Sequence, residues 1–285
     1  SLPGDLTDEQ RRQAVDLILE YSDQFSKSEF DIGQTTVMTH HIDTGNNKPF
    51  RQPLRRHPIQ QLPIIDAHVE EMLKHGIIKP AVSEWAQNVV LIRKADQTWR
   101  FAVDMRQLND LTVKDSYTLP RIDTCLDALS GSVFFSSCDL RQAYWQVKLD
   151  EESAPKTCFL TRKGSWQFEV LAYGMVNAPA CFERLMDRVL SGLTWQACLV
   201  YLDDVLVYAP TFEEHIKRLR AVLERFREAN LKLKPSKCRF FQRKVKFLGN
   251  IVSADGILPD PEKVRAVREW PVPNNLTAVR AFMAL

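Results

Sequence analysis

The sequence predicts an α+β fold, in which strands form groups between helices instead of alternating with them. Short apolar runs of strand type cluster around residues 88–104, 133–150, 158–170 and 198–208. Stretches with apolar residues at helical spacing lie before, between and after these groups. Because the two kinds of element do not alternate regularly, the pattern does not favour a parallel sheet.

Length and composition are typical of a globular protein with substantial cores. The chain has 285 residues, enough for one large domain or two ordinary ones, with 45% hydrophobic and 26% charged residues. The net charge is only +2, but residues 232–246 hold seven Lys or Arg and no acid, and residues 51–56 hold three Arg. Basic runs are usually solvent-exposed faces of a protein. These two runs are therefore only supporting evidence for a nucleic-acid partner.

Other features of the composition exclude several classes of protein. The six Cys are widely spaced and the six His form no ligand pattern, so we expect buried, reduced thiols in an intracellular protein without a zinc site. There is no signal peptide and no apolar run long enough to cross a membrane. The first residue is Ser1 and not Met, so we expect a processed product or a fragment.

Two helices are predicted in the N-terminal region. Thr7 and Gln10 form a capping box before a helix with four apolar residues at helical spacing, which are Ala14, Leu17, Ile18 and Tyr21. Residues 26–63 are irregular. The second helix ends at Gly76 and is striped by Ile65, Val69, Met72 and Leu73.

Strands are predicted next. Residues 88–93 and 99–104 form a hairpin around Asp96-Gln97, and the apolar run 133–138 leads directly into Asp139.

Alternation predicts a further half-buried strand, in which Trp145, Val147 and Leu149 face inward and the residues between them face solvent. Another hairpin pairs the region of Cys158 with residues 166–170.

Three more helices are predicted towards the C-terminus. The first has one apolar face, made by Phe182, Leu185, Met186, Val189 and Leu190. Thr211 and Glu214 cap the second, and Asp260-Pro261 begins the third, which ends before Pro271.

The stretch Tyr201–Asp204 is a candidate functional site. It separates two short apolar runs of the kind that form buried strands joined by a tight turn. Adjacent carboxylates in an apolar setting repel each other and lose solvation, and residues 193–212 contain no Lys or Arg to compensate. A divalent metal ion would compensate. The alternative is an acidic hairpin turn at the surface.

Asp43-Thr44-Gly45 matches the centre of the aspartic-protease signature. That signature has an apolar strand before the Asp and a small residue after the Gly, whereas here His40-His41-Ile42 precedes and Asn46-Asn47-Lys48 follows. The sequence therefore does not favour a protease.

Seven segments occur in a specific order over nearly the whole chain: Trp99–Asp104, Arg106–Asn109, Tyr117–Arg121, Asp139–Tyr144, Gly174–Pro179, Tyr201–Asp204 and Phe247–Gly249. Together they resemble the polymerase region of the reverse transcriptases of Ty3/gypsy-class LTR retrotransposons. A lone Y-x-D-D motif is weak evidence, but the ordered set is highly specific.

The resemblance implies a right-hand polymerase fold, with fingers, a palm whose antiparallel sheet is backed by helices, and a partial thumb. Residues 1–48 would be an N-terminal helix and extended linker, residues 49–257 the fingers and palm, and residues 258–285 the truncated start of the thumb. The fingers would comprise residues 49–127 and 154–173.

The resemblance also implies a metal site. Asp139, Asp203 and Asp204 would be the catalytic residues and would hold two Mg²⁺ ions, or Mn²⁺, with Leu140 as a further metal-site residue. Taken alone, Asp139 reads more simply as the cap of a strand end.

Nucleotide-binding residues follow from the same resemblance. Tyr144 would lie beneath the incoming sugar and exclude a 2′-hydroxyl, the alternative being ordinary aromatic packing. Arg100, with Arg93 or Lys94, would neutralise the triphosphate, the alternative being a solvated hairpin face. Further dNTP contacts are expected from Arg141, Gln142, Ala143 and Tyr173.

The resemblance assigns a second group of residues to primer and template. Phe247, Leu248 and Gly249 match the primer grip, where the Gly would let the primer backbone approach, and the alternative is a simple turn glycine. Tyr201, Asn177 and Pro179 are also expected to contact primer or template.

The implied reaction is RNA-directed DNA polymerisation, the addition of dNMP from dNTP to a primer 3′-hydroxyl on an RNA or DNA template. Expected partners are the template–primer duplex, dNTP and, in the parent Pol polyprotein, RNase H, integrase and protease domains. The expected location is the cytoplasm, in the virus-like particle of the element, or the nucleus.

Two alternatives are a non-catalytic nucleic-acid-binding or structural subunit of a domesticated element, and an RNA-dependent RNA polymerase. The intact Asp set argues against the first, and the bulky Tyr144 against the second.

Overall fold

A four-stranded antiparallel sheet forms the centre of the protein. The computed structural model describes residues 2–93, 97–118 and 120–283, and orders this sheet β11-β5-β10-β9. The strands are β5 (Phe134–Asp139), β9 (Cys198–Tyr201), β10 (Asp204–Ala209) and β11 (Arg239–Gln242). In β10, every residue after Asp204 is buried, as expected for a strand that is covered on both faces.

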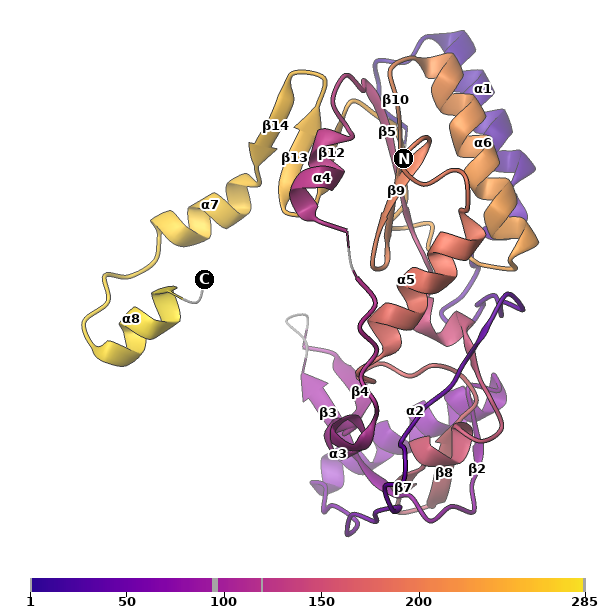
Figure 1. Ribbon diagram of the computed structural model, residues 1–285, viewed down its shortest axis with the longest axis vertical. Coiled ribbons are helices and arrows are strands. Elements are labelled where there is room, and N and C mark those ends of the chain that lie inside the picture. The colour runs from indigo at the N-terminus through magenta and orange to yellow at the C-terminus, as the bar shows by residue number, and fades with distance from the viewer. Residues whose placement is uncertain (1, 94–96, 119, 284–285) are drawn as a thin grey trace.

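Helices cover one face of this sheet (Figure 1). Helix α6 packs on β10 and β5, α5 packs on β9, and α1 lies beside α6. The helices are α1 (Asp8–Glu20), α5 (Ala178–Val189) and α6 (Phe212–Glu228). A smaller apolar cluster covers the other face and includes Cys125 of α4 (Ile122–Asp127) and Phe247 of β12 (Lys244–Phe247).

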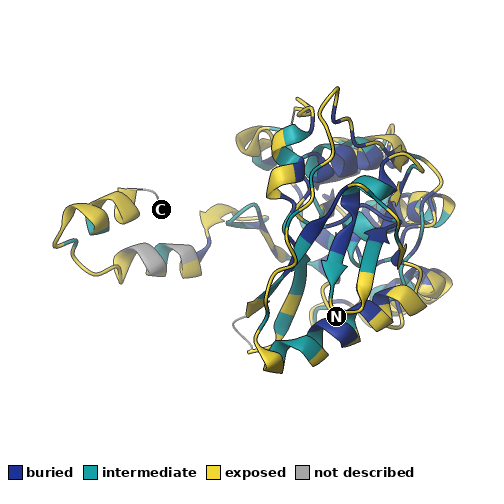
Figure 2. Ribbon diagram, turned by 90° about the horizontal axis from the view of Figure 1, so that it is seen from below, coloured by how far each residue is buried: buried dark blue, intermediate teal, exposed yellow. Residues whose placement is uncertain are grey.

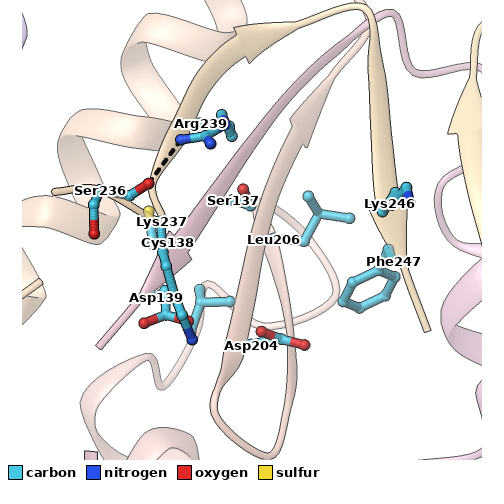
Figure 3. A pocket seen from close by; sticks show the side chains of 11 residues that line it. Ser137, Cys138, Asp139, Asp204, Leu206, Ser236, Lys237, Arg239, Lys246 and Phe247 are labelled. Atoms are coloured by element: carbon cyan, nitrogen blue, oxygen red, sulfur yellow. Dashed lines mark hydrogen bonds and ion pairs between the residues drawn. The ribbon is translucent and has the colours of Figure 1, made fainter. Parts of the chain in front are cut away.

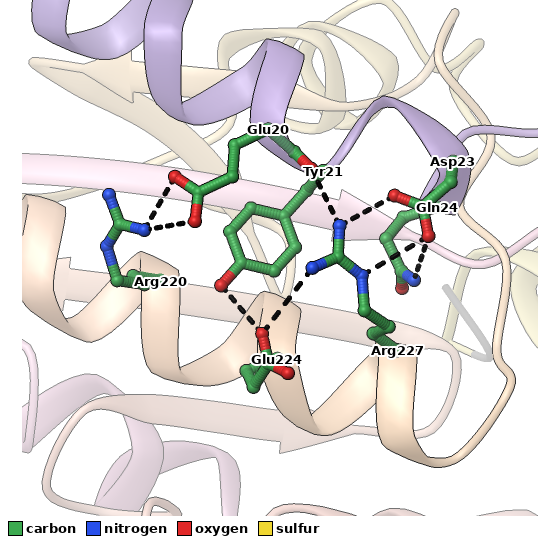
Figure 4. Close-up of polar contacts among 7 residues, drawn as sticks. All are labelled: Glu20, Tyr21, Asp23, Gln24, Arg220, Glu224 and Arg227. Atoms are coloured by element: carbon green, nitrogen blue, oxygen red, sulfur yellow. Dashed lines mark hydrogen bonds and ion pairs between the residues drawn. The ribbon is translucent and has the colours of Figure 1, made fainter.

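Polar contacts join the end of α1 and the 3₁₀ turn η1 (Ser22–Gln24) to α6 (Figure 4). The contacts that span the two elements are Arg220 with Glu20 (2.5 Å), Tyr21 with Glu224 (2.8 Å) and Arg227 with Asp23 (2.7 Å). Isolated exposed ion pairs contribute little, but this network fixes the direction in which the chain leaves α1.

A second, five-stranded sheet lies at the other end of the molecule, with strand order β2-β8-β7-β3-β4 (Figure 1). Its strands are β2 (Ile78–Pro80), β3 (Gln87–Arg93), β4 (Trp99–Val103), β7 (Phe159–Thr161) and β8 (Gly164–Phe168). Helix α2 (Leu62–Lys74) packs on it through buried Ile65, Val69 and Met72. The short helix α3 (Arg106–Leu111) follows β4, and the turn η4 (Ala154–Thr157) precedes β7.

The C-terminal region extends away from both sheets (Figures 1 and 2). A three-stranded sheet, made by β12, β13 (Asn250–Ser253) and β14 (Gly256–Pro259), leads to α7 (Pro261–Arg268) and α8 (Leu276–Met283). No residue of α8 is buried.

The predicted α+β class and the antiparallel sheet backed by helices are confirmed. The capping box at Thr7 and the cap at Thr211 are present, and all six Cys are buried and free. No helix in the described ranges combines the length and apolarity that a membrane span needs. The division into three domains stays a prediction.

One predicted strand is wrong. The region of Trp145 forms a 3₁₀ turn, η3 (Ala143–Gln146), and only β6 (Lys148–Leu149) is extended, pairing with β1 (Thr39–His40). Gln146 is fully buried, not solvent-facing, because both ends of its amide find backbone partners. Alternation cannot reveal this, since those partners lie partly in a distant segment.

Candidate active site

Two carboxylates face each other across the central sheet. In the antiparallel pairing of β5 with β10, Asp204 is directly opposite Asp139. The turn between β9 and β10 contains Leu202, whose φ of +54° is left-handed, and Asp203. The chain thus brings together all three predicted carboxylates, although more than sixty residues separate Asp139 from the turn.

The three carboxylates destabilise one another in the ionised form. Burial, then the charges of Asp204 and Asp139, raise the pKa of Asp203 to about 6. Burial and Asp139 also raise the pKa of Asp204. The Oδ1 atom of Asp203 is buried and has no hydrogen-bond partner among the described residues. Such an orphaned oxygen is costly unless a ligand satisfies it.

Lys237 partly compensates this charge, and the sequence analysis missed it. Its Nζ lies 3.0 Å from Oδ2 of Asp139, and it also lowers the pKa of Asp203 and of Asp204. Figure 3 shows the Lys237 side chain reaching towards Asp139. The sequence analysis considered only cations near Asp203 in the chain, whereas Lys237 arrives from the segment that precedes β11.

The acidic pair lies in an open cavity of about 260 Å³ (Figure 3). Its walls come from β5, β10, β12 and residues 236–239, and they include Arg239, Lys246 and Phe247. Arg239 and Lys246 therefore border the cavity together with Lys237, which lies beside Asp139. A polyanion could lie along these cations with its end at the carboxylates.

The donor set suits a hard divalent cation. Carboxylate oxygens are preferred ligands of Mg²⁺ and Mn²⁺, and the orphaned Asp203 oxygen is available to one. However, no group of three or more His, Cys, Asp or Glu in the described part of the chain has metal-binding geometry as it stands. The side chains would have to converge, and Lys237 would have to release Asp139. The metal role of Leu140 stays a prediction.

A row of aromatic side chains adjoins the acidic turn. The ring of Tyr144 lies 5.1 Å from Tyr173 and 5.8 Å from Phe182, and the guanidinium of Arg100 lies 5.4 Å from Tyr173. Burial and the charge of Asp203 raise the pKa of Tyr144 to about 12 and raise that of Tyr173 further. Both phenols are therefore neutral, and Tyr144 is only partly buried.

The structure brings only one of the predicted Arg residues to this row. In the β3–β4 hairpin, Arg100 is opposite Ile92, whereas Arg93 is opposite Trp99 and its guanidinium stacks on that ring at 5.8 Å. Because neighbouring residues of a strand face opposite ways, Arg93 and Arg100 lie on different faces of the hairpin. Lys94 lies outside the described residues.

The side chains of Arg141 and Gln142 point to the N-terminal segment. Arg141 Nε donates to the carbonyl oxygen of Glu29, and Gln142 Nε2 donates to the Glu29 carboxylate, each at 3.3 Å. Ala143 is buried. These contacts direct both side chains towards Glu29 in this structure.

Glu183 is a second residue that sequence reasoning missed. It lies on the apolar face of α5, only 2% exposed, and its Oε2 accepts a hydrogen bond of 2.9 Å from the backbone N–H of Leu202. Burial raises the pKa of Glu183 to about 7. The signal in the sequence that could have identified Glu183 is an acidic residue between Phe182 and Leu185, in a helix face predicted to be apolar.

The predicted primer and template residues fall into two groups. Phe247 borders the acidic cavity, and Leu248 and Gly249 form the β12–β13 turn, both with positive φ. Tyr201 packs in the smaller apolar cluster beside Leu248.

Asn177 and Pro179 instead lie at the start of α5. There the Asn177 amide accepts from the N–H of Asp115 and donates to the carbonyl of Val113. In this structure Asn177 therefore holds the loop at Val113 and Asp115 against the start of α5.

Comparisons with known proteins agree with this geometry. Residues 92–252 match the family model described as reverse transcriptase (RNA-dependent DNA polymerase). The chain is 35% identical, over 88% of its length, to the Pol polyprotein from transposon 297 of Drosophila melanogaster, and 32% identical, over 98%, to that from transposon gypsy of the same species. It covers 24% and 27% of those relatives, so it spans about a quarter of their length.

Solved structures resemble the fold. A foamy viral protease–reverse transcriptase in complex with dsDNA superposes with a TM-score of 0.89 and 22% identity, covering 98% of this chain and 58% of that one. The same type of protein in complex with an RNA/DNA hybrid gives 0.87 and 22%, covering 98% and 38%. At this identity the likeness concerns the fold alone, and it confirms the predicted right-hand fold.

Proposed function

Because the chain belongs to the reverse transcriptase (RNA-dependent DNA polymerase) family, we propose that it transfers dNMP from dNTP to a primer 3′-hydroxyl. The template would be RNA or DNA. The observation that carries the proposal is the opposition of Asp139 and Asp204 across β5 and β10, with the orphaned Asp203 oxygen beside them. A purely structural role does not explain three mutually repelling carboxylates at one end of the central sheet.

Magnesium ions held by Asp139, Asp203 and Asp204 would supply the positive charge that activates the 3′-hydroxyl and stabilises departing pyrophosphate. The remaining roles belong to the protein itself. Arg100 lies beside Tyr173 and is exposed, so it can donate to phosphate oxygens. Tyr144 is held by Tyr173 and Phe182, so its ring can act as a fixed steric limit beneath the sugar.

The duplex would lie along the basic wall of the cavity. Lys246 and Arg239 border it, and phosphate contacts from such residues give affinity without sequence preference. The foamy viral proteins form complexes with dsDNA and with an RNA/DNA hybrid, which supports the same class of partner here. Further Pol domains in the parent protein are part of the same proposal.

Primer extension tests this function. The parent chain, given Mg²⁺, dNTP and an annealed primer on an RNA or a DNA template, should lengthen the primer. Asp203→Asn should reduce the rate by at least about a hundredfold, because charge stabilisation of this kind is worth that much. Asp255→Asn, in the exposed β13–β14 turn, is the matched control and should act as the parent.

The competing function makes the opposite prediction. Duplex binding without any extension by the parent chain would contradict the polymerase proposal and favour a non-catalytic binding subunit.

A further inference from the structure

The irregular segment after α1 runs from the helices that cover the central sheet to the loop that contains Tyr144. We call residues 25–35 the strap and residues 141–146 the nucleotide loop. We infer that the strap is a positioning element, which holds the nucleotide loop in the geometry that dNTP binding requires. The inference rests on the proposed function, because that function gives the loop its role.

The first part of the strap is tied to both the helices and the loop. The network in Figure 4 fixes Gln24, whose carbonyl accepts from the N–H of Leu233 at 2.8 Å. The N–H of Ser26 then donates to the carbonyl of Leu233 at 2.9 Å. Leu233 also forms a bridge with Leu140 on its other side. Residues 232–234 therefore lie between the strap and the start of the nucleotide loop.

The middle of the strap adds charge and stacking. Asp31 pairs with Lys232 at 2.7 Å, with both side chains about a quarter exposed (26% and 25%), so solvent screens this pair less than a surface pair. The ring of Phe30 stacks on His75 at 4.6 Å and lies 6.1 Å from Trp145 of the loop. Phe30 thus bridges the end of α2 and the nucleotide loop.

The end of the strap packs against Gln146, the residue that closes the loop. Gln146 Nε2 donates to the carbonyls of Arg141 (2.8 Å) and Lys232 (3.0 Å). The N–H of Thr35 donates to the carbonyl of Gln146 at 2.8 Å. Both ends of the loop are therefore joined through one buried amide, and the strap covers it.

Gly33 makes the close approach possible. A Cβ at this position would lie 1.9 Å from the carbonyl oxygen of Asn230 and 3.0 Å from Oε1 of Gln146. Gly33 is buried, so a larger side chain cannot turn to solvent and must displace one of these groups. The strap backbone at Gly33 is therefore tightly packed against Asn230 and Gln146 and is not a loose linker.

The nucleotide loop needs such support because it contains a backbone conformation that its residue type does not favour. Gln142 has a φ of +46°, a left-handed conformation that a residue other than Gly adopts only when its surroundings impose it. Glu29 of the strap accepts from the side chains of Arg141 and Gln142, on the outer side of this bend. A displaced strap would allow the bend to relax and shift the backbone before Tyr144.

The test compares Gly33→Ala with Gly4→Ala, a control glycine of the same N-terminal region with open space around its Cβ position. A small displacement of a binding group costs about ten- to a hundredfold. We therefore expect Gly33→Ala to raise the KM for dNTP about tenfold, with the Kd for primer–template unchanged. Gly4→Ala should match the parent in both. Phe30→Ala removes the stacking without introducing a clash, so it replaces Gly33→Ala in the test if that variant does not fold. It should also raise the KM for dNTP.

Hydrogen exchange gives a readout that does not need activity. Amides of residues 141–147 should exchange faster in Gly33→Ala and Phe30→Ala than in Gly4→Ala, whereas those of β10 should not change. An unchanged KM and unchanged exchange in both strap variants would overturn the inference while leaving the polymerase proposal intact. Equal losses in KM, kcat and primer–template Kd would also overturn it, since they indicate general destabilisation. A parent chain without activity but with the predicted exchange pattern would contradict only the proposed function.

Discussion

Replacing Asp203 with Asn should stabilise the metal-free protein. Burial and the charges of Asp204 and Asp139 raise the pKa of Asp203 from 3.8 to about 6. Since one pH unit corresponds to about 1.4 kcal/mol, ionised Asp203 lowers the free energy of unfolding by roughly 3 kcal/mol at neutral pH before screening. The side chain is only partly buried, so we expect about 1–2 kcal/mol to remain.

The effect should depend on pH in a defined way. A raised carboxyl pKa means that the folded state binds a proton more tightly than the unfolded state. The stability of the parent therefore falls as pH rises from about 4 to about 6 and then levels off. Asp203→Asn lacks this titration, so its advantage should be near zero at about pH 4 and complete above about pH 6.

Thermal unfolding in EDTA measures the difference. At about pH 7.5 the melting temperature of Asp203→Asn should exceed that of the parent by a few degrees, because about 1 kcal/mol shifts it by roughly 2–4 °C in a chain of this size. Asp255→Asn should melt as the parent. Added Mn²⁺ should raise the melting temperature of the parent more than that of Asp203→Asn. A variant that melts at or below the parent temperature in EDTA at about pH 7.5 would refute the electrostatic reasoning.

Three further predictions use the same site. Tyr144→Val should raise ribonucleotide incorporation at least about tenfold relative to dNTP, because it removes a ring fixed by its neighbours; unchanged discrimination in competition assays would place the sugar gate elsewhere. Lys237→Gln should lower the Mn²⁺ concentration for half-saturation, measured by calorimetry, because the ammonium 3.0 Å from Asp139 competes with a metal ion; weaker binding would contradict that competition. Glu183→Leu, which leaves the N–H of Leu202 unpaired, should be about 1–3 kcal/mol less stable than Glu183→Gln, which keeps an acceptor, and should extend primers more slowly than that variant. Equal behaviour of the two Glu183 variants in unfolding and extension assays would exclude the hydrogen bond as the cause.

The sequence was sufficient where local pattern and motif order determine the structure. Strand β5 ends at Asp139 and the turn before β10 carries Asp203, as predicted, because apolar runs and a polar break define them. Lys237 was not predictable from charge near the turn, because the contact depends on how the segment before β11 pairs with β5. The burial of Gln146 depends on a partner in residues 230–233, and no period in its own segment can reveal that.

The same reasoning applies to Arg93 and Arg100. Both belong to one basic hairpin in the sequence, but their relative facing depends on the register across the turn. A shift of one residue would pair Arg93 with Arg100 and place both on the same face of the hairpin. Sequence alone therefore indicated a cationic hairpin, and the structure is needed to select Arg100.

The left-handed residues show why these long-range contacts matter at the site. Leu202, Gln142 and Leu248 have φ values of +54°, +46° and +50°. Leu202 precedes Asp203, Gln142 belongs to the nucleotide loop, and Leu248 follows Phe247 of the cavity wall. For residues other than Gly this conformation costs roughly 1–2 kcal/mol, and it persists only where the surroundings impose it. Glu183 meets this need at Leu202, and the strap meets it at Gln142. Because both supports come from distant parts of the chain, the geometry of the site depends on elements that contribute no group to the reaction itself.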